Sequence, residues 1–263
     1  MSKSRHLTTA DARMCEPVRR YDRVDALRGL AMVWMAAFHF CFDLSHFGYW
    51  PQDFLGDPFW TTQRTLIVSL FLLCAGMGQA VAWQRAIAWS RFWHRWAQVA
   101  ACALLVTVGS YFMFPRSFIY FGVLHGMALM LLIARLTAGW GAWLWPAGAL
   151  ALLSPWLAAW LLQGPFADLA PLFNSRALNW LGWVTRKPFT EDYVPILPWL
   201  GVMWWGVAGG QRLMARHAQW LARPLADVAA PLVVLGRYSL SFYMLHQPVM
   251  LGMLMLWGRL VRA

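Results

Sequence analysis

The sequence predicts an all-α integral membrane protein, a polytopic bundle of about seven transmembrane helices. Of its 263 residues, 60% are hydrophobic and only 13% are charged, and a water-soluble domain could not bury that much apolar surface. Several apolar runs reach the roughly 18 residues that a helix needs to cross the hydrocarbon core of a bilayer. We therefore expect the bilayer to be the solvent of most of the chain.

Seven apolar runs are expected to form these helices. Between the sixth and seventh, residues 213–230 mix arginines with Trp220 and leucines, which indicates a short helix lying in the membrane interface. The expected spans are 24–44, 65–83, 96–114, 118–134, 140–162, 193–210 and 232–257.

The distribution of arginine and lysine predicts the topology. Basic residues concentrate in an N-terminal segment, 1–23, and in the connections 85–95 and 212–223. The positive-inside rule places all three in the cytoplasm. We expect a basic cytoplasmic segment at 1–23 and one transmembrane domain at 24–263, in a bacterial inner membrane with the N-terminus cytoplasmic.

The net charge of +11 is dispersed between apolar runs and forms no basic stripe. We expect membrane lipids, and no nucleic acid, as the partners of this charge. The four cysteines show no paired spacing, so neither a disulfide nor a metal site is expected.

The first span carries few polar residues, and they are regularly placed. Arg28 and His39 are eleven residues apart, about three helical turns and roughly 16 Å along one face. Arg28, at the cytoplasmic end, can grip a phosphate by paired hydrogen bonds, or it is merely a topology charge. Asp43 follows His39 by one turn, so its carboxylate can accept a hydrogen bond from the imidazole and form a dyad for general base catalysis.

Other polar residues point toward the same region. Arg64 enters the second span at a depth close to Asp43, where it binds substrate or forms a salt bridge to Asp43 that joins the two helices. His125 lies beside glycines in the fourth span, and a role in binding substrate is as reasonable as a hydrogen bond across a helix interface.

The last span has a polar stripe, and the first is followed by a further histidine. Ser239, Tyr243 and His246 follow spacings of four and three, so they line one face of a helix, which is expected to face the bundle interior and bind substrate. His46 lies in an aromatic outer loop, either as an interface residue or as part of an acceptor site.

Several sequence runs resemble known membrane acyltransferases. The Arg28 to His39 spacing and the run at 235–246 resemble the enzymes that O-acylate bacterial surface glycans. More closely, the runs at 23–29, 121–125 and 193–201 together resemble the bacterial branch of the heparan-α-glucosaminide N-acetyltransferase catalytic-domain family.

The resemblance implies transfer of an acyl group, most simply acetyl, from cytoplasmic acyl-CoA to a sugar amine or hydroxyl on the far side of the membrane. It implies that Arg28 holds the CoA phosphates and that His39 activates the acceptor or carries the acyl group. The lysosomal enzyme of the family has its active-site histidine in the loop after its first helix, where this chain has His46. His39 and His46 therefore both stay open as the catalytic residue.

Two functions from other classes compete with acyl transfer. A haem-binding membrane protein would use His39, His125 and His246 as axial ligands, but this leaves Arg28 and Asp43 unexplained. A proton-coupled transporter would use the same histidines as a relay, yet the sequence has no inverted repeat. A homodimer is also kept open.

Overall fold

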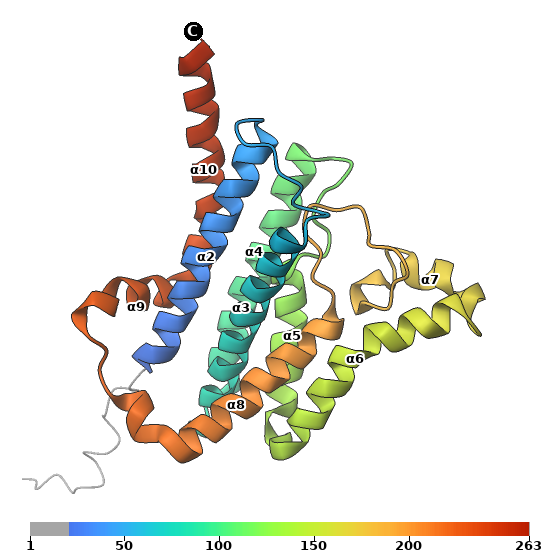
Figure 1. Ribbon diagram of the computed structural model, residues 1–263. Coiled ribbons are helices and arrows are strands. Elements are labelled where there is room, and N and C mark those ends of the chain that lie inside the picture. The colour runs from blue at the N-terminus through green and yellow to red at the C-terminus, as the bar shows by residue number, and fades with distance from the viewer. Residues whose placement is uncertain (1–20, 263) are drawn as a thin grey trace, which may run out of the picture.

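The computed structural model describes residues 21–262, and that part of the chain is a helix bundle without a named β-strand (Figure 1). The expected all-α class is thus confirmed. The longer helices are α2 (Asp22–His46), α3 (Pro58–Gln84), α4 (Trp89–Met113), α5 (Val123–Thr137), α6 (Leu144–Gln163), α8 (Ile196–Ala222) and α10 (Ser239–Arg262). Shorter elements are η1 (Ala138–Trp143), η2 (Ala167–Leu169), α7 (Ala170–Asn174), η3 (Asn179–Leu181), η4 (Asp227–Ala229) and α9 (Ala230–Arg237).

Five helical stretches within the described residues are long and apolar enough to cross a membrane. They comprise α2, α3, α4, a stretch from Val123 to Gln163, and Ser239–Leu260 of α10. The fourth stretch contains α5 and α6, which run in opposite directions because the chain reverses at η1, where Gly141 has a φ of 58°. The multi-pass membrane bundle is confirmed, and the number seven stays a prediction.

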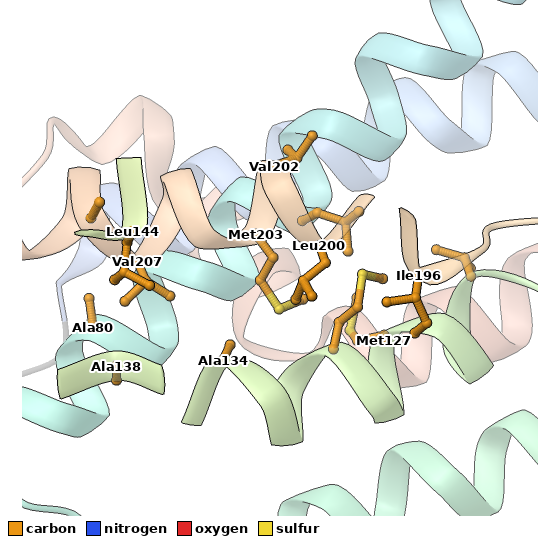
Figure 2. Close-up of a cluster of buried hydrophobic side chains, with 14 of the residues drawn as sticks. Ala80, Met127, Ala134, Ala138, Leu144, Ile196, Leu200, Val202, Met203 and Val207 are labelled. Carbon is orange, nitrogen blue, oxygen red and sulfur yellow. The ribbon is translucent and has the colours of Figure 1, made fainter. Parts of the chain in front are cut away.

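The hydrophobic core forms around α8. Met203 and Val207 of this helix are fully buried, and they belong to one cluster with Ala80 of α3, Met127 of α5 and Leu144 of α6 (Figure 2). Within a membrane such side chains stabilise the bundle through van der Waals contact with one another and not through removal from water. The cluster holds the middle of the bundle together and leaves α2 and α10 at one edge (Figure 1).

Small residues let α8 approach α3 closely. A Cβ atom on Gly76 of α3 would overlap the backbone carbonyl of Met203, and one on Gly206 would overlap that of Leu73. Such close backbone packing is typical of helices within membranes, where van der Waals contact supplies much of the association energy.

The end of the chain differs from the predicted pattern. The predicted span 232–257 is divided at Tyr238 into α9 and α10, and the predicted interfacial helix 213–230 is wrong as a unit, since α8 continues to Ala222. Hydropathy averaged over the span does not show the break, because apolar runs flank the polar residues Arg237 and Ser239 on both sides. Close backbone contact with α2, at Gly29 and Gly236, holds this short helix apart from α10.

The basic segments meet at one end of the bundle, in agreement with the charge pattern. The guanidinium group of Arg23 lies 4.2 Å from the ring centroid of Trp220 in α8, and that of Arg85 lies 4.9 Å from the ring of Tyr21. Such cation–π contacts join the start of α2, the end of α3 and the end of α8. Most of the predicted segment 1–23 lies outside the described residues, and its side of the membrane stays a prediction.

Candidate functional site

Two histidines from opposite ends of the chain meet between α2 and α10. The ring centroids of His39 and His246 are 5.2 Å apart, and the ring planes are inclined by 57°. Nδ1 of His246 lies 2.8 Å from the carbonyl oxygen of Tyr243, so we assign the proton to Nδ1 and a free lone pair to Nε2. Nε2 is buried and has no hydrogen-bond partner within residues 21–262, and it can therefore accept a proton.

Asp43 pairs with α10 and not with His39. Its Oδ1 accepts a hydrogen bond of 2.8 Å from Nε2 of Gln247, and its side chain is almost completely buried. No hydrogen bond joins His39 to Asp43 in the described part of the chain, so the expected dyad is corrected. The amide of Gln247 takes the place at Asp43 that the His39 ring was expected to fill, while the ring packs against His246 at the neighbouring level of the helix pair.

Aromatic rings surround the histidine pair. Phe242 stacks on His246 with centroids 5.7 Å apart, and Phe38 meets His39 edge-on at 5.9 Å. Tyr243 lies 5.8 Å from the ring of His246 and faces Phe71 of α3. These rings exclude water, which strengthens electrostatic interactions inside the site.

Two further predicted residues lie at the edges of this group. Ser239 is partly buried and begins α10 one turn before Tyr243, as the spacing predicts. His46 is exposed in the last turn of α2, where its ring meets that of Phe114, the residue after α4, edge-on with centroids 6.4 Å apart. His46 follows Asp43 by about one turn and is exposed at the end of α2, so it lies about two turns beyond His39 along this helix and not beside it.

Arg28 lies toward the opposite end of α2. Its Nη1 is 2.9 Å from Oδ1 of Asp25 and 3.4 Å from the carbonyl oxygen of Gly236 in α9. The side chain keeps 22% exposure, so a ligand can reach it. The ten residues between Arg28 and His39 lie in one unbroken helix, and the separation of eleven positions places the two groups about 16 Å apart.

Arg64 does not form the expected salt bridge. No ion pair joins it to Asp43 among residues 21–262, and its charge instead interacts with those of Asp192 and Lys187 in the loop before α8. Burial raises the pKa of Asp192, although a 2.7 Å hydrogen bond from the backbone N–H of Val123 and the nearby cations oppose this. Burial, followed by the charge of Arg64, lowers the pKa of Lys187.

His125 has a complete set of hydrogen bonds. Its Nδ1 accepts from the backbone N–H of Gly122 at 3.3 Å, so Nε2 carries the proton and donates to Oγ1 of Thr107 at 2.9 Å. The Thr107 hydroxyl donates in turn to the carbonyl of Ile119 at 2.8 Å. Of the two roles left open, this geometry favours a structural one, fixing the bend before α5.

Three residues that make contacts in or near the candidate site were not predicted from the sequence. Gln247 is a polar residue in an apolar span and could have been found by the rule that identified His39. Arg237 lies within the run 235–246 and Asp192 directly before the run 193–201, but only their tertiary contacts reveal them. In the part of the chain that the structure describes, no group of three His, Cys, Asp or Glu residues is placed to hold a metal ion.

The fold and these contacts define a multi-pass α-helical membrane protein with a buried polar site between its first and last long helices. A profile described as heparan-alpha-glucosaminide N-acetyltransferase, catalytic, matches residues 20–248, and the chain belongs to this family. Every predicted site residue lies within the match. No similar protein is found among curated sequences, and none among solved structures.

Membership of this family decides between the competing functions. It indicates a membrane acetyltransferase and does not favour a haem protein or a proton-coupled transporter. Enzymes of this kind generally use acetyl-CoA as donor, which agrees with the donor expected from the sequence.

Proposed function

We propose that the chain transfers an acetyl group from cytoplasmic acetyl-CoA to a hydroxyl or amine of a sugar-containing acceptor on the far side of a bacterial inner membrane. The observation that carries this proposal is the His39–His246 pair, in which the buried Nε2 of His246 has no partner among the described residues. A neutral imidazole with a free nitrogen is the usual protein group for taking a proton near neutral pH.

The donor would lie along α2. Arg28 would hold phosphates of CoA at the end of the helix where the basic segments gather, and the thioester would reach His39 about three turns away. A long donor with phosphates at one end and a reactive thioester at the other suits this separation. Before a donor binds, Asp25 and the carbonyl of Gly236 hold the guanidinium group at this end of α2.

In the chemical step the acceptor oxygen or nitrogen would attack the thioester carbon. His39 would take the proton of the acceptor, the carbon–sulfur bond would break, and the thiolate of CoA would leave and be protonated. His246 would contact the acceptor through Nε2 or take the proton from it directly. His46, at the exposed end of α2, remains the alternative base.

Unpartnered acceptor atoms support a hydroxyl or amine as the attacking group. Oδ2 of Asp43, Oε1 of Gln247 and Nε2 of His246 are all buried without partners in the described residues. Buried polar atoms are normally hydrogen-bonded, and a ligand that carries O–H or N–H donors would satisfy them. Asp43, Tyr243 and Ser239 would then orient this ligand.

The test is acetyl-CoA binding and turnover by detergent-purified protein, comparing wild type with Arg28→Ala and His39→Ala. Glucosamine serves as the amine acceptor and methyl glucoside as the hydroxyl acceptor. His94→Ala, at an exposed histidine of α4, is the matched control. Proteoliposomes with acetyl-CoA on one side and acceptor on the other test the direction.

We expect Arg28→Ala to weaken acetyl-CoA binding and His39→Ala to abolish transfer while binding persists. His94→Ala should behave as wild type. Absence of acetyl-CoA affinity in the wild-type protein would overturn the proposal. Unchanged turnover in a folded His39→Ala protein would move the catalytic role to His46 or His246.

A further inference from the structure

All three ion pairs found within residues 21–262 gather where α2 begins and α9 ends. Arg28 binds Oδ1 of Asp25 at 2.9 Å, and Nε of Arg237 lies 3.8 Å from Oδ2 of the same carboxylate. Arg237 also binds Asp22 at 2.7 Å. The carboxylate of Asp25 therefore lies between two guanidinium groups that come from two helices.

Backbone packing fixes these two arginines relative to one another. A Cβ atom on Gly29 would overlap the carbonyl of Leu232, and one on Gly236 would overlap the carbonyl of Asp25. Helices α2 and α9 are thus in direct backbone contact on both sides of the arginine pair. The position of Arg237 does not depend on its ion pairs alone.

The place held by Asp25 has the chemistry of a phosphate site. Guanidinium groups bind carboxylate and phosphate oxygens with the same planar pairs of N–H donors. Both arginines are accessible, since the side chain of Arg237 is 39% exposed and that of Arg28 is 22% exposed. A phosphate oxygen could replace each carboxylate oxygen without movement of either helix.

We infer that Arg237 is a second phosphate-binding residue, that Arg237 and Arg28 together hold a phosphate of CoA, and that Asp25 is the counter-ion which this phosphate displaces. The inference rests on the proposed function, because it takes CoA as the donor. The guanidinium ends of these ion pairs are partly exposed, which weakens the pairs, although the Asp25 carboxylate is itself buried. Charge-assisted bonds from two arginines to one phosphate are stronger, so the exchange is favourable.

The test is the affinity of the full-length protein in detergent for CoA, measured for wild type and for Arg237→Gln, Arg237→Lys and Asp25→Asn. Arg216→Gln is the matched control, because it removes one positive charge from an exposed residue of α8 that takes part in none of the three ion pairs. Thiol release from S-acetylpantetheine, a donor without phosphates, separates phosphate binding from folding.

We expect Arg237→Gln to weaken CoA binding roughly tenfold or more and to leave turnover of S-acetylpantetheine unchanged. The CoA affinity of Arg237→Lys should lie between those of wild type and Arg237→Gln, because lysine keeps the charge but loses the paired donors. Asp25→Asn should tighten CoA binding by roughly two- to fivefold, as expected from loss of a weak competing ion pair.

The outcomes separate the inference from the function on which it rests. Wild-type binding of CoA together with an unchanged Arg237→Gln variant overturns the phosphate role and leaves the proposed function standing. If Arg237→Gln loses CoA binding and turnover of S-acetylpantetheine to the same extent, Arg237 acts in folding and not in phosphate binding. Weaker binding by a folded Asp25→Asn protein overturns the counter-ion role, and no binding of CoA by the wild-type protein overturns the proposed function itself.

Discussion

His39 and His246 lie in contact although 207 residues separate them along the chain, with ring centroids 5.2 Å apart. The hydrogen bond between Asp43 and Gln247 joins the same two helices at the neighbouring level. The site therefore requires both α2 and α10, and each contributes one histidine and one further polar side chain. In a low-dielectric interior these contacts are strong when satisfied and costly when broken.

Removal of the second histidine is expected to remove most of the activity. His246→Ala should lower acetyl transfer by roughly 10²- to 10⁴-fold, the usual contribution of a positioned acid–base group, while acetyl-CoA still binds. Steady-state kinetics and direct binding measure the two effects separately. His246→Gln, which keeps a hydrogen-bonding side chain, shows whether acetyl transfer needs proton transfer by this residue or only its shape. A near-normal rate of acetyl transfer in both variants would exclude His246 from the chemistry.

Loss of the Gln247 amide is expected to lower stability. Gln247→Leu leaves the buried carboxylate of Asp43 without its partner, and such a loss costs about 1–3 kcal/mol. The Tm in detergent should fall accordingly. Replacing both partners in the double variant Asp43→Leu/Gln247→Leu should recover part of the Tm, because no buried group is then left unpaired; a single variant as stable as wild type would contradict this account.

Local patterns in the sequence were sufficient for the fold class and for part of the site. Long apolar runs predict membrane helices, and the rule that polar residues inside such helices are functional identifies His39, Asp43 and His246. The sequence could not show that Asp43 pairs with Gln247, since its helical spacing to His39 offered a nearer partner. Which side chain becomes the hydrogen-bond partner of Asp43 depends on how helices distant in the sequence pack together.

The loop before α8 was missed for a related reason. Asp192 lies in an irregular segment without periodicity, and its role follows from a hydrogen bond to the start of α5, 69 residues earlier. The separation of α9 from α10 was likewise hidden, because an apolar run predicts one helix whether or not the chain bends within it.

The hydrogen bonds of His125 predict a purely structural effect. Thr107→Val removes the hydroxyl oxygen that accepts the hydrogen bond from Nε2–H of His125. Loss of this bond should lower the free energy of unfolding by about 1 kcal/mol. We expect a lower Tm with unchanged KM for acetyl-CoA. Thr65→Val, at an exposed threonine of α3, is the control, and a large change in KM at normal Tm would bring His125 back as a substrate-binding residue.

The buried carboxyl of Asp192 predicts a pH dependence of stability. Because burial raises its pKa in the folded protein, the folded chain holds this proton more tightly than the unfolded chain. The contribution of Asp192 to stability is then greatest at low pH and is lost as the pH rises through the raised pKa. In Asp192→Asn this dependence is absent, so the Tm of wild type minus that of the variant should decrease as the pH rises above about 4, the usual pKa of an aspartate. Asp168→Asn, at an exposed position in η2, should show no such trend. A difference in Tm that grows with pH would mean that Arg64 and Lys187 outweigh burial and hold the carboxyl of Asp192 ionised.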